Sequence, residues 1–328
     1  MKLLVTGGLG FIGSNFILYV LKKFSNFSIV NIDAEFYGSN HISLEEISNF
    51  ENYEFIKGDI NDSSKIDKLV SESDVIINFA AESFVDRSIA NVKPFLNSNI
   101  DGVYTILEAI KKHKKRFLQI STDEVYGSLK EGSATEQYQY NPSSPYAATK
   151  ACAEMLVNSY HITYDCETLI TRCTNNYGPR QFPEKLIPKT ILLAENNKKI
   201  PVYGTGENLR DWLYVSDHCE AILSVLQKGK SGESYNIASG NEVDNMTIIK
   251  KILSIMAKDE NLIEFVEDRP GHDFRYSMNS QKLQNELGWK PKINFDEGLK
   301  NTIEWYISNP TWWKNLSEKL FGHTPWKQ

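Results

Sequence analysis

The sequence contains few cysteines and no long apolar run. Four of its 328 residues are cysteines, and their spacing matches neither a metal site nor a disulfide framework: Cys152, Cys166, Cys173 and Cys219. No apolar stretch approaches the ~20 residues that a membrane-spanning helix needs. The first apolar run, residues 3–5, ends at glycines and is too short for a signal peptide. We therefore expect a cytoplasmic protein with no metal site and no membrane partner.

An excess of basic residues is also absent. The chain has 36 Lys and Arg against 42 Asp and Glu, which gives a net charge of −6. Its one basic run, residues 111–116, contains no aromatic residue and is typical of the solvated C-terminal end of a helix. We therefore expect no nucleic-acid partner. A hydrophobic content of 41% is ordinary for a globular protein of one large domain or two joined ones.

Strand patterns alternate with helical patterns through the first half of the chain. Short apolar runs predict strands at residues 2–6, 28–33, 53–57, 74–79, 117–120 and 167–173. Helical patterns lie between them, at residues 14–24, 64–71, 92–112 and 146–164. This alternation predicts an α/β fold with a Rossmann-type, doubly wound parallel sheet.

The character of the sequence changes from residue 175. Prolines and glycines divide the chain into short pieces, and we expect helices at residues 216–228, 247–258, 280–287 and 296–308. The pattern predicts a smaller, mixed α/β C-terminal domain. The sequence after residue 309 carries no pattern that we can interpret.

A glycine-rich turn follows the first predicted strand. Gly8, Gly10 and Gly13 satisfy G-x-G-x-x-G, and Gly7 with Gly10 and Gly13 satisfies G-x-x-G-x-x-G. Glycines at these positions let the backbone approach a pyrophosphate, which the N-terminus of the next helix also attracts. Asp33 ends the second strand, where a carboxylate accepts hydrogen bonds from an adenine ribose. Its charge would repel a 2′-phosphate, so the sequence predicts NAD rather than NADP.

Tyr146 and Lys150 are four residues apart in the long predicted helix, so they share a face. We expect the lysine to lower the pKa of the phenol, which could then accept a proton from an alcohol. Asp123 and Glu124 form a second candidate pair, directly after the strand at 117–120. Neighbouring carboxyl groups in a dry cleft have separated pKa values, as one acid and one base require.

Five longer motifs resemble the dTDP-glucose 4,6-dehydratase family of the extended short-chain dehydrogenase/reductase superfamily. They occur in family order, between residue 1 and about 307, at residues 80–88, 122–127, 182–188, 210–214 and 268–273. The resemblance implies a hydro-lyase that oxidises the sugar at C4, eliminates water across C5 and C6 and returns the hydride to C6. The product would be a 4-keto-6-deoxy sugar nucleotide of deoxysugar biosynthesis.

The resemblance also implies the catalytic roles. Tyr146, beside Lys150, would deprotonate the C4 hydroxyl, and Thr122 would hydrogen-bond the C4 oxygen. Glu124 would take the C5 proton, and Asp123 would protonate the departing C6 hydroxyl.

Two sets of binding residues follow from the same resemblance. The NAD set is Gly7, Gly10, Phe11, Ile12, Gly13, Asp33, Asp59, Ile60, Phe79, Ala80, Ala81, Ser83, Ser98, Asn99, Tyr146, Lys150 and Asn176. The set for a nucleoside-diphosphate glucose, with dTDP-glucose favoured, is Glu82, Ser83, Thr122, Asn175, Lys185, Leu186, Pro188, Pro201, Tyr203, Arg210, Asn236, Arg269 and His272.

The resemblance further implies two domains with different ligands and a homodimer. Residues 1–174, with returning segments around 211–240, would form the NAD-binding domain. Residues 175–210 and 241–328 would bind the nucleotide-sugar. The long helices at 92–112 and 146–164 resemble those that the superfamily pairs between two subunits.

Alternatives remain at the level of substrate and reaction. Phe84 stands where the family commonly has histidine, and Arg180 where it often has an aromatic residue, both near the expected substrate path. A UDP- or CDP-glucose 4,6-dehydratase would use the same acids. A 4-epimerase would not need Asp123 and Glu124, and a non-catalytic NAD-binding protein would need none of the catalytic groups.

Overall fold

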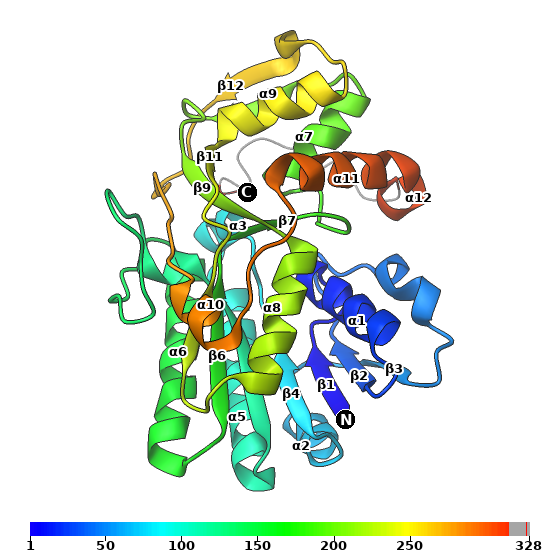
Figure 1. Ribbon diagram of the computed structural model, residues 1–328, viewed down its shortest axis with the longest axis vertical. Helices are drawn as coiled ribbons and strands as arrows, with labels where there is room; N and C mark the ends of the chain where they lie inside the picture. The colour runs from blue at the N-terminus through cyan, green and yellow to red at the C-terminus, as the bar shows by residue number, and fades with distance from the viewer. Residues whose placement is uncertain (315–325, 327–328) are drawn as a thin grey trace.

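A seven-stranded parallel sheet forms the centre of the larger part of the chain (Figure 1). The computed structural model describes residues 1–314 and Trp326. The strands are β1 (Lys2–Thr6), β2 (Ser28–Asp33), β3 (Tyr53–Lys57), β4 (Val75–Asn78), β5 (Arg116–Thr122), β6 (Thr168–Cys173) and β10 (Ser234–Ile237). Their order is β10-β6-β5-β4-β1-β2-β3. Strands β2 and β3 are added on one side of β1, and β4, β5, β6 and β10 are added on the other side. The predicted doubly wound sheet is confirmed.

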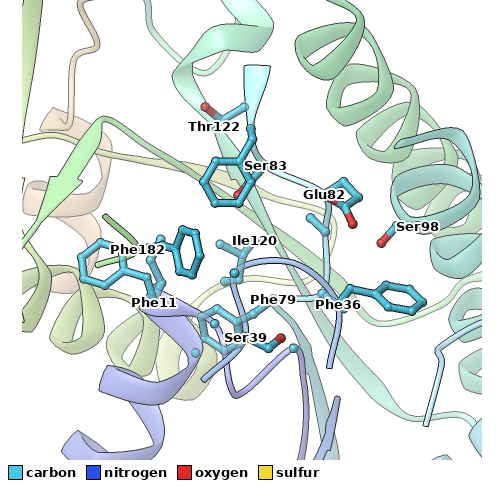
Figure 2. A pocket seen from close by; sticks show the side chains of 18 of the residues that line it. Phe11, Phe36, Ser39, Phe79, Glu82, Ser83, Ser98, Ile120, Thr122 and Phe182 are labelled. Atoms are coloured by element: carbon cyan, nitrogen blue, oxygen red, sulfur yellow. The ribbon is translucent and has the colours of Figure 1, made fainter. Parts of the chain in front are cut away.

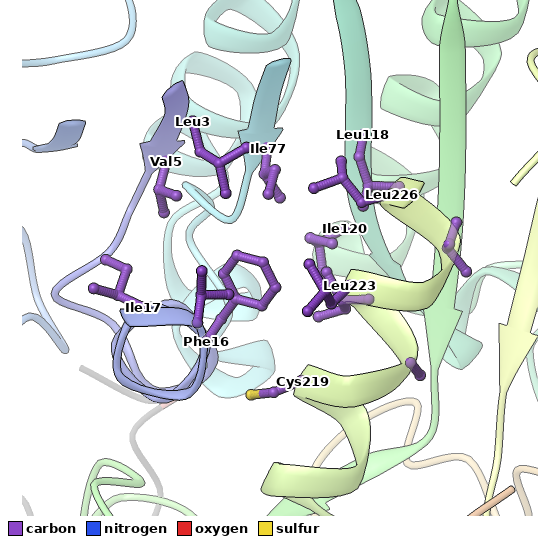
Figure 3. Packing of buried hydrophobic residues seen from close by; sticks show 14 of the residues in the cluster. Leu3, Val5, Phe16, Ile17, Ile77, Leu118, Ile120, Cys219, Leu223 and Leu226 are labelled. Atoms are coloured by element: carbon purple, nitrogen blue, oxygen red, sulfur yellow. The ribbon is translucent and has the colours of Figure 1, made fainter. Parts of the chain in front are cut away.

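Helices cover both faces of this sheet, because successive strand residues point to opposite sides. Leu3 and Val5 of β1 belong to one core cluster and Leu4 to another. The first cluster joins α1 (Phe11–Lys23), α8 (Val215–Lys228) and α10 (Gln281–Leu287) to the sheet, as Figure 3 shows for Phe16, Ile17, Leu223 and Leu226. The second joins α2 (Ser63–Ser71), α5 (Gly102–His113) and α6 (Pro145–Tyr164).

A smaller part contains two short sheets and lies above the large sheet in Figure 1. One sheet has the order β11-β9-β7, and the other pairs β12 with β8. These strands are β7 (Asn175–Tyr177), β8 (Ile200–Tyr203), β9 (Leu209–Tyr214), β11 (Glu242–Asp244) and β12 (Ile263–Val266). Packed with them are α7 (Leu186–Glu195), α9 (Asn245–Ile255), α11 (Phe295–Ser308) and α12 (Pro310–Trp313).

Short helical segments connect the strands near the carboxyl edge of the large sheet. They are α3 (Val85–Ala90), α4 (Lys93–Leu96), the 3-10 turns at His41–Ile47 and Asp123–Tyr126, and a π-helical turn at Asn97–Asp101. A further 3-10 turn, Glu260–Leu262, precedes β12 in the smaller part. That π turn joins α4 to α5, so the helical pattern predicted at 92–112 is one interrupted helix. π turns occur mostly as single-turn interruptions of helices, often at functional sites, and this one carries Ser98 and Asn99.

Helix α7 was not predicted, because Pro188 argued against a helix in that segment. The structure places Pro188 at the third position of α7, in the turn whose N–H groups have no partner within the helix. Proline is tolerated there because it removes no hydrogen bond.

Candidate active site

The glycine turn between β1 and α1 leaves no room for side chains. Gly7 has a φ of +70°, and a Cβ atom on it would lie 2.5 Å from the backbone nitrogen of Ala80. A Cβ atom on Gly13 would lie 2.6 Å from the Gly7 carbonyl oxygen. Gly10 precedes α1 and offers no side-chain cap, so the first N–H groups of the helix have no side-chain acceptor there. This is the cradle that a pyrophosphate requires.

Asp33, at the end of β2, is buried beside this turn. Its Oδ2 accepts a hydrogen bond from the Leu9 amide at 2.9 Å. Its Oδ1 accepts from the Glu35 amide at 2.8 Å and from the Ser39 hydroxyl at 2.9 Å. The carboxylate therefore fixes the glycine turn relative to the loop that follows Asp33. Asp33 also lines a large cavity at this end of the sheet.

One cavity runs from the glycine turn to the catalytic candidates (Figure 2). Every residue expected to bind NAD lines it except Asn99. The Asn99 amide instead accepts from the Glu82 amide at 2.8 Å and donates to the Glu82 carbonyl oxygen at 3.0 Å. Asn99 therefore holds the lining segment at 80–83 from behind.

The cavity wall also includes a loop that the sequence did not single out. Residues 34–39 follow Asp33 directly and bring Phe36 and Tyr37 to the lining. The Tyr37 ring contacts Phe84 at a centroid distance of 5.0 Å and Phe182 at 4.9 Å. Its hydroxyl donates to Glu184. The aromatic pair next to Asp33 was the available signal, although sequence alone gives no contact with residues 182–184.

Asp123 has the environment of a proton donor. Burial, reinforced by the Glu124 charge, raises the pKa of its carboxyl group to about 8. Thr122 Oγ1 donates to Asp123 Oδ1 at 3.1 Å, whereas Asp123 Oδ2 is buried without a hydrogen-bond partner within the described residues. At neutral pH the carboxyl group is therefore largely protonated.

Glu124 lies beside Asp123 but faces the cationic side of the cleft. Burial raises its pKa, while Arg269, Lys185 and Arg210 act in the opposite direction by favouring the carboxylate. These cations act differently on the two acids: Arg210 favours the Asp123 carboxylate, whereas all three favour that of Glu124. The geometry thus distinguishes an acid, Asp123, from its neighbour.

Tyr146 and Lys150 lie on the buried face of α6, as predicted. Lys150 Nζ donates to the carbonyl oxygen of Ile120 at 2.6 Å, and burial lowers the pKa of Lys150 to about 8. Burial and the charge of Glu124 raise the pKa of Tyr146 well above its usual value, against a side-chain hydrogen bond with Thr122. The expectation that the phenol pKa is lowered is therefore wrong, because burial and the Glu124 charge raise it.

A second cavity adjoins the first, and Phe84, Asn175 and Lys185 line both. Of the residues expected to bind the nucleotide-sugar, those lining it are Asn175, Lys185, Leu186, Pro201, Tyr203, Arg210, Arg269 and His272. Glu82, Ser83 and Thr122 line the first cavity. The expected substrate residues therefore occupy two connected spaces.

The cations of the second cavity are held in place. Arg269 Nη1 pairs with Asp86 Oδ1 at 2.9 Å. Arg210 Nη2 donates to the Asp273 carbonyl oxygen at 2.8 Å, and Lys185 Nζ donates to the Ser83 carbonyl oxygen at 2.9 Å. Fixed cations of this kind suit a diphosphate group.

Two expected substrate residues lie outside both cavity linings. Pro188 is buried within α7. Asn236 is fully buried, with its side-chain amide bonded to the Tyr126 hydroxyl and the Ala134 carbonyl oxygen. Asn245, the first residue of α9, lines the second cavity and was not among the expected residues. Sequence reasoning missed it because an asparagine at a helix start is common.

The two departures from the family pattern have different surroundings. Phe84 lines both cavities, and Lys185 Nζ lies 4.8 Å from its ring centroid. Arg180 lies in neither lining: it donates to the Ser43 carbonyl oxygen, pairs with Glu46 at 3.0 Å and lies over the Trp305 ring. Arg180 therefore does not line either cavity, although the neighbouring Gln181 and Phe182 line the first.

No group of three or more His, Cys, Asp or Glu side chains that could hold a metal occurs in the described part of the chain. Among these residues, no helix is long and apolar enough to cross a membrane.

The parallel sheet, the glycine cradle and the Tyr146–Lys150 face together define an extended short-chain dehydrogenase/reductase. Comparison with known proteins narrows this class. The family described as GDP-mannose 4,6 dehydratase matches residues 4–302. A dTDP-glucose 4,6-dehydratase from Streptomyces niveus is 44% identical over 321 residues, covering 96% of each chain. The chain belongs to the nucleotide-sugar 4,6-dehydratases, and within them to the dTDP-glucose 4,6-dehydratase family.

Two further relatives extend the comparison. The low-salt glycan biosynthesis protein Agl12 of Haloferax volcanii is 49% identical over 310 residues, covering 94% of this chain and 99% of that protein. The crystal structure of dTDP-glucose 4,6-dehydratase from Bacillus anthracis in complex with NAD is 46% identical, with a TM-score of 0.91. It aligns with 97% of this chain and 100% of its own.

Proposed function

We propose that this chain converts dTDP-glucose to dTDP-4-keto-6-deoxyglucose, with NAD as cofactor, in deoxysugar nucleotide biosynthesis. The observation that carries the proposal is the Asp123–Glu124 pair, with Asp123 buried and Glu124 half-buried, which shares a cavity with Tyr146 and Lys150. An oxidoreductase that only transferred hydride would need Tyr146 and Lys150 but not the acid pair. Elimination of water also needs an acid for the leaving hydroxyl and a base for the adjacent carbon.

The first cavity fits NAD. The glycine cradle has no room for a Cβ atom at Gly7 or Gly13, and Asp33 presents a carboxylate to the expected ribose. Bound NAD supplies a hydride acceptor for C4 and, in its reduced form, the hydride returned to C6. The lining residues around Phe11, Asp59 and Ser98 would enclose the cofactor.

The side chains of the chain supply the proton transfers. Tyr146 accepts the proton of the C4 hydroxyl, and Thr122, hydrogen-bonded to both Tyr146 and Asp123, orients the C4 oxygen. Once C4 is a ketone, the C5 proton is acidic and passes to Glu124. Asp123 gives its proton to the C6 hydroxyl, which leaves as water, and Glu124 returns its proton to C5 as C6 accepts the returned hydride. The proton that Tyr146 took from the C4 hydroxyl balances the one that Asp123 gave up.

The required protonation states have a structural basis. Asp123, with a pKa of about 8, carries a proton at neutral pH. Glu124 faces Arg269, Lys185 and Arg210, which favour its ionised form and so oppose the effect of burial. A carboxylic acid and a carboxylate can thus act side by side in one cycle.

Tyr146 needs a further charge to act as a base. Burial raises the pKa of its phenol well above the usual value and so favours the protonated form. The nicotinamide ring of oxidised NAD is a cation and would favour the phenolate when it binds nearby. Proton abstraction would then be restricted to the complex.

The second cavity suits the nucleoside diphosphate. Lys185, Arg210 and Arg269 supply its positive charge, and Trp212, Asn245 and His272 provide apolar and polar wall. UDP-glucose and CDP-glucose remain alternative substrates. A 4-epimerase would not need Asp123 and Glu124, which both line the first cavity. A non-catalytic NAD-binding protein would not need the complete set of catalytic groups.

Three broader features are part of the proposal. Residues 1–174, with the segment around 211–240, would bind NAD, and residues 175–210 and 241–328 the nucleotide-sugar. The protein would act in the cytoplasm as a homodimer. Support for the dimer comes from the apolar side chains that α5 and α6 expose, with Ile162 82% and Met155 52% exposed.

A panel of dTDP-, UDP-, CDP- and GDP-glucose tests the substrate assignment. Mass spectrometry of each reaction should show loss of one water from the nucleotide-sugar, fastest for dTDP-glucose. Formation of a C4 epimer of unchanged mass, or no product from any of the four, would refute the proposal. Faster turnover of UDP- or CDP-glucose would change the assigned nucleotide but leave the assigned reaction, dehydration, unchanged.

A further inference from the structure

One buried ion pair contacts the acid-bearing turn from both sides. Glu154 of α6 and Arg172 of β6 are 0% and 3% exposed at their side chains. Arg172 donates to Glu154 Oε2 through Nε at 2.8 Å and through Nη2 at 2.6 Å. The pair therefore joins α6, which carries Tyr146 and Lys150, to the strand beside β5.

The contacts with the turn lie directly before and after the catalytic residues. Ser121 Oγ, one residue before Thr122, donates to Glu154 Oε1 at 2.5 Å. The Tyr126 hydroxyl, two residues after Glu124, accepts from Arg172 Nη1 at 2.6 Å and donates to Asn236 Oδ1 at 2.9 Å. The segment that carries Thr122, Asp123 and Glu124 is thus held at both ends by the same pair.

The following loop is attached to the same pair. The Tyr140 hydroxyl donates to Glu154 Oε2 at 2.9 Å, and Arg172 Nη1 donates to the Glu136 carbonyl oxygen at 3.1 Å. Neither Glu154 nor Arg172 lines either cavity, so neither can touch a ligand there. Any effect on the reaction must pass through the groups that they hold.

Stability alone is a weak reason for such a pair. Removing two charges from water costs several kcal/mol per ion in proteins, and apolar residues of similar volume are often as stable. A fully bonded polar network does, however, restrict its members to one arrangement. Catalytic groups benefit from that restriction, since a displacement of about 1 Å can reduce the rate about 100-fold.

We propose that Glu154 and Arg172 are positioning residues, which fix the turn at 121–126 against α6 so that the acid pair stays aligned with Tyr146. This inference rests on the proposed function and deepens it. The residue at position 154 also follows Tyr146 and Lys150 at helical spacing, so all three side chains leave one face of α6.

The main test replaces both charges together, as Glu154→Leu with Arg172→Met, so that no unpaired charge stays buried. We expect the double variant to fold, with KM for dTDP-glucose within about twofold of wild type and kcat about 100-fold lower. Reduced cofactor should accumulate during turnover, because the displaced acid pair slows elimination more than Tyr146-dependent oxidation. An unchanged kcat in the folded variant would overturn the proposal.

A matched control and two milder variants complete the test. Glu242→Gln breaks another ion pair, with Arg275 at 2.6 Å, outside both cavities, and should leave kcat within about twofold. Tyr126→Phe and Ser121→Ala each remove one link without leaving a charge. Each should lower kcat several-fold at constant KM. If both leave kcat unchanged, the proposal fails even when the double variant does not fold.

Hydrogen exchange separates this inference from the proposed function. Wild type that turns over none of the nucleotide-sugars would refute the function. The positioning role would still predict faster amide exchange across residues 121–127 in Tyr126→Phe and Ser121→Ala, but not in Glu242→Gln. Unchanged exchange in both turn variants would overturn the positioning role whatever the activity.

Discussion

The Thr122 hydroxyl donates a hydrogen bond to Asp123 Oδ1 at 3.1 Å, while Asp123 Oδ2 is buried without a partner in the described part of the chain. One oxygen of the acid is thereby engaged and the other stays available. A protonated carboxyl group in this arrangement can direct its proton toward a substrate hydroxyl.

Asp123→Asn should separate oxidation from elimination. The amide has a similar shape but cannot donate the proton that the leaving hydroxyl needs, so dehydration should fall by about 100- to 10,000-fold. Rapid-mixing absorbance should still show reduced cofactor on addition of dTDP-glucose, because Tyr146 and Lys150 are intact. Wild-type rates of product formation in this variant would contradict the role of Asp123.

The pH dependence of kcat should have an alkaline limb near pH 8. The raised pKa of Asp123, about 8, means that its proton is present below that pH and lost above it. Lys150, also with a pKa of about 8, loses its positive charge over the same range. We therefore expect kcat to fall as the pH rises above about 8, by about tenfold per pH unit for each of these groups whose proton the reaction needs. A kcat that rises steadily from pH 7 to about 9 would exclude a protonated Asp123 as the acid.

Asp33→Asn should weaken the discrimination between NAD and NADP. The substitution keeps a hydrogen-bond acceptor for the Leu9 amide and removes the charge that repels a 2′-phosphate. Calorimetry on cofactor-stripped protein should show the ratio of the two dissociation constants change by at least about tenfold, or ~1.4 kcal/mol. Glu35→Gln is the control, since Glu35 pairs with Lys57 and His41 on the surface. An unchanged ratio in Asp33→Asn would refute the assignment.

Arg269→Lys should impair binding more than chemistry. Arg269 is oriented by Asp86 at 2.9 Å, and lysine cannot reproduce a planar, two-pronged contact with a diphosphate. Steady-state kinetics should show KM raised about 10- to 100-fold with kcat within about threefold. Arg275→Lys, outside both cavities, should change neither. A large fall in kcat at constant KM would place Arg269 in the chemistry instead.

The sequence was informative where local pattern and tertiary structure agree. Apolar runs of strand length marked every strand of the large sheet up to β6. Strands buried on both faces must be apolar, and all of these strands except the edge strand β3 are largely buried. The glycine turn was recognisable because its glycines are required by contacts with Ala80 and with its own backbone. The spacing of Tyr146 and Lys150 likewise placed both on one face of α6.

Residues that depend on long-range packing were harder to predict. Asn236 lies within the short strand β10 and Asn245 directly follows the short strand β11. Only the fold shows that the first bonds Tyr126 whereas the second lines a cavity. Tyr37 reaches the segment at 182–184, far away in sequence, through contacts that no local pattern encodes. The side-chain environment of Tyr146 was also misjudged, because burial outweighs the lysine that the spacing places nearby.

The fate of the C4 hydrogen tests the central claim most directly. The protein should be incubated with dTDP-glucose that carries deuterium at C4, and the product analysed by NMR and mass spectrometry. The account predicts a 4-keto-6-deoxy sugar nucleotide with the deuterium at C6, since the hydride removed beside Tyr146 is the one returned after Asp123 and Glu124 eliminate water. Deuterium retained at C4 of a product that has lost no water would contradict it.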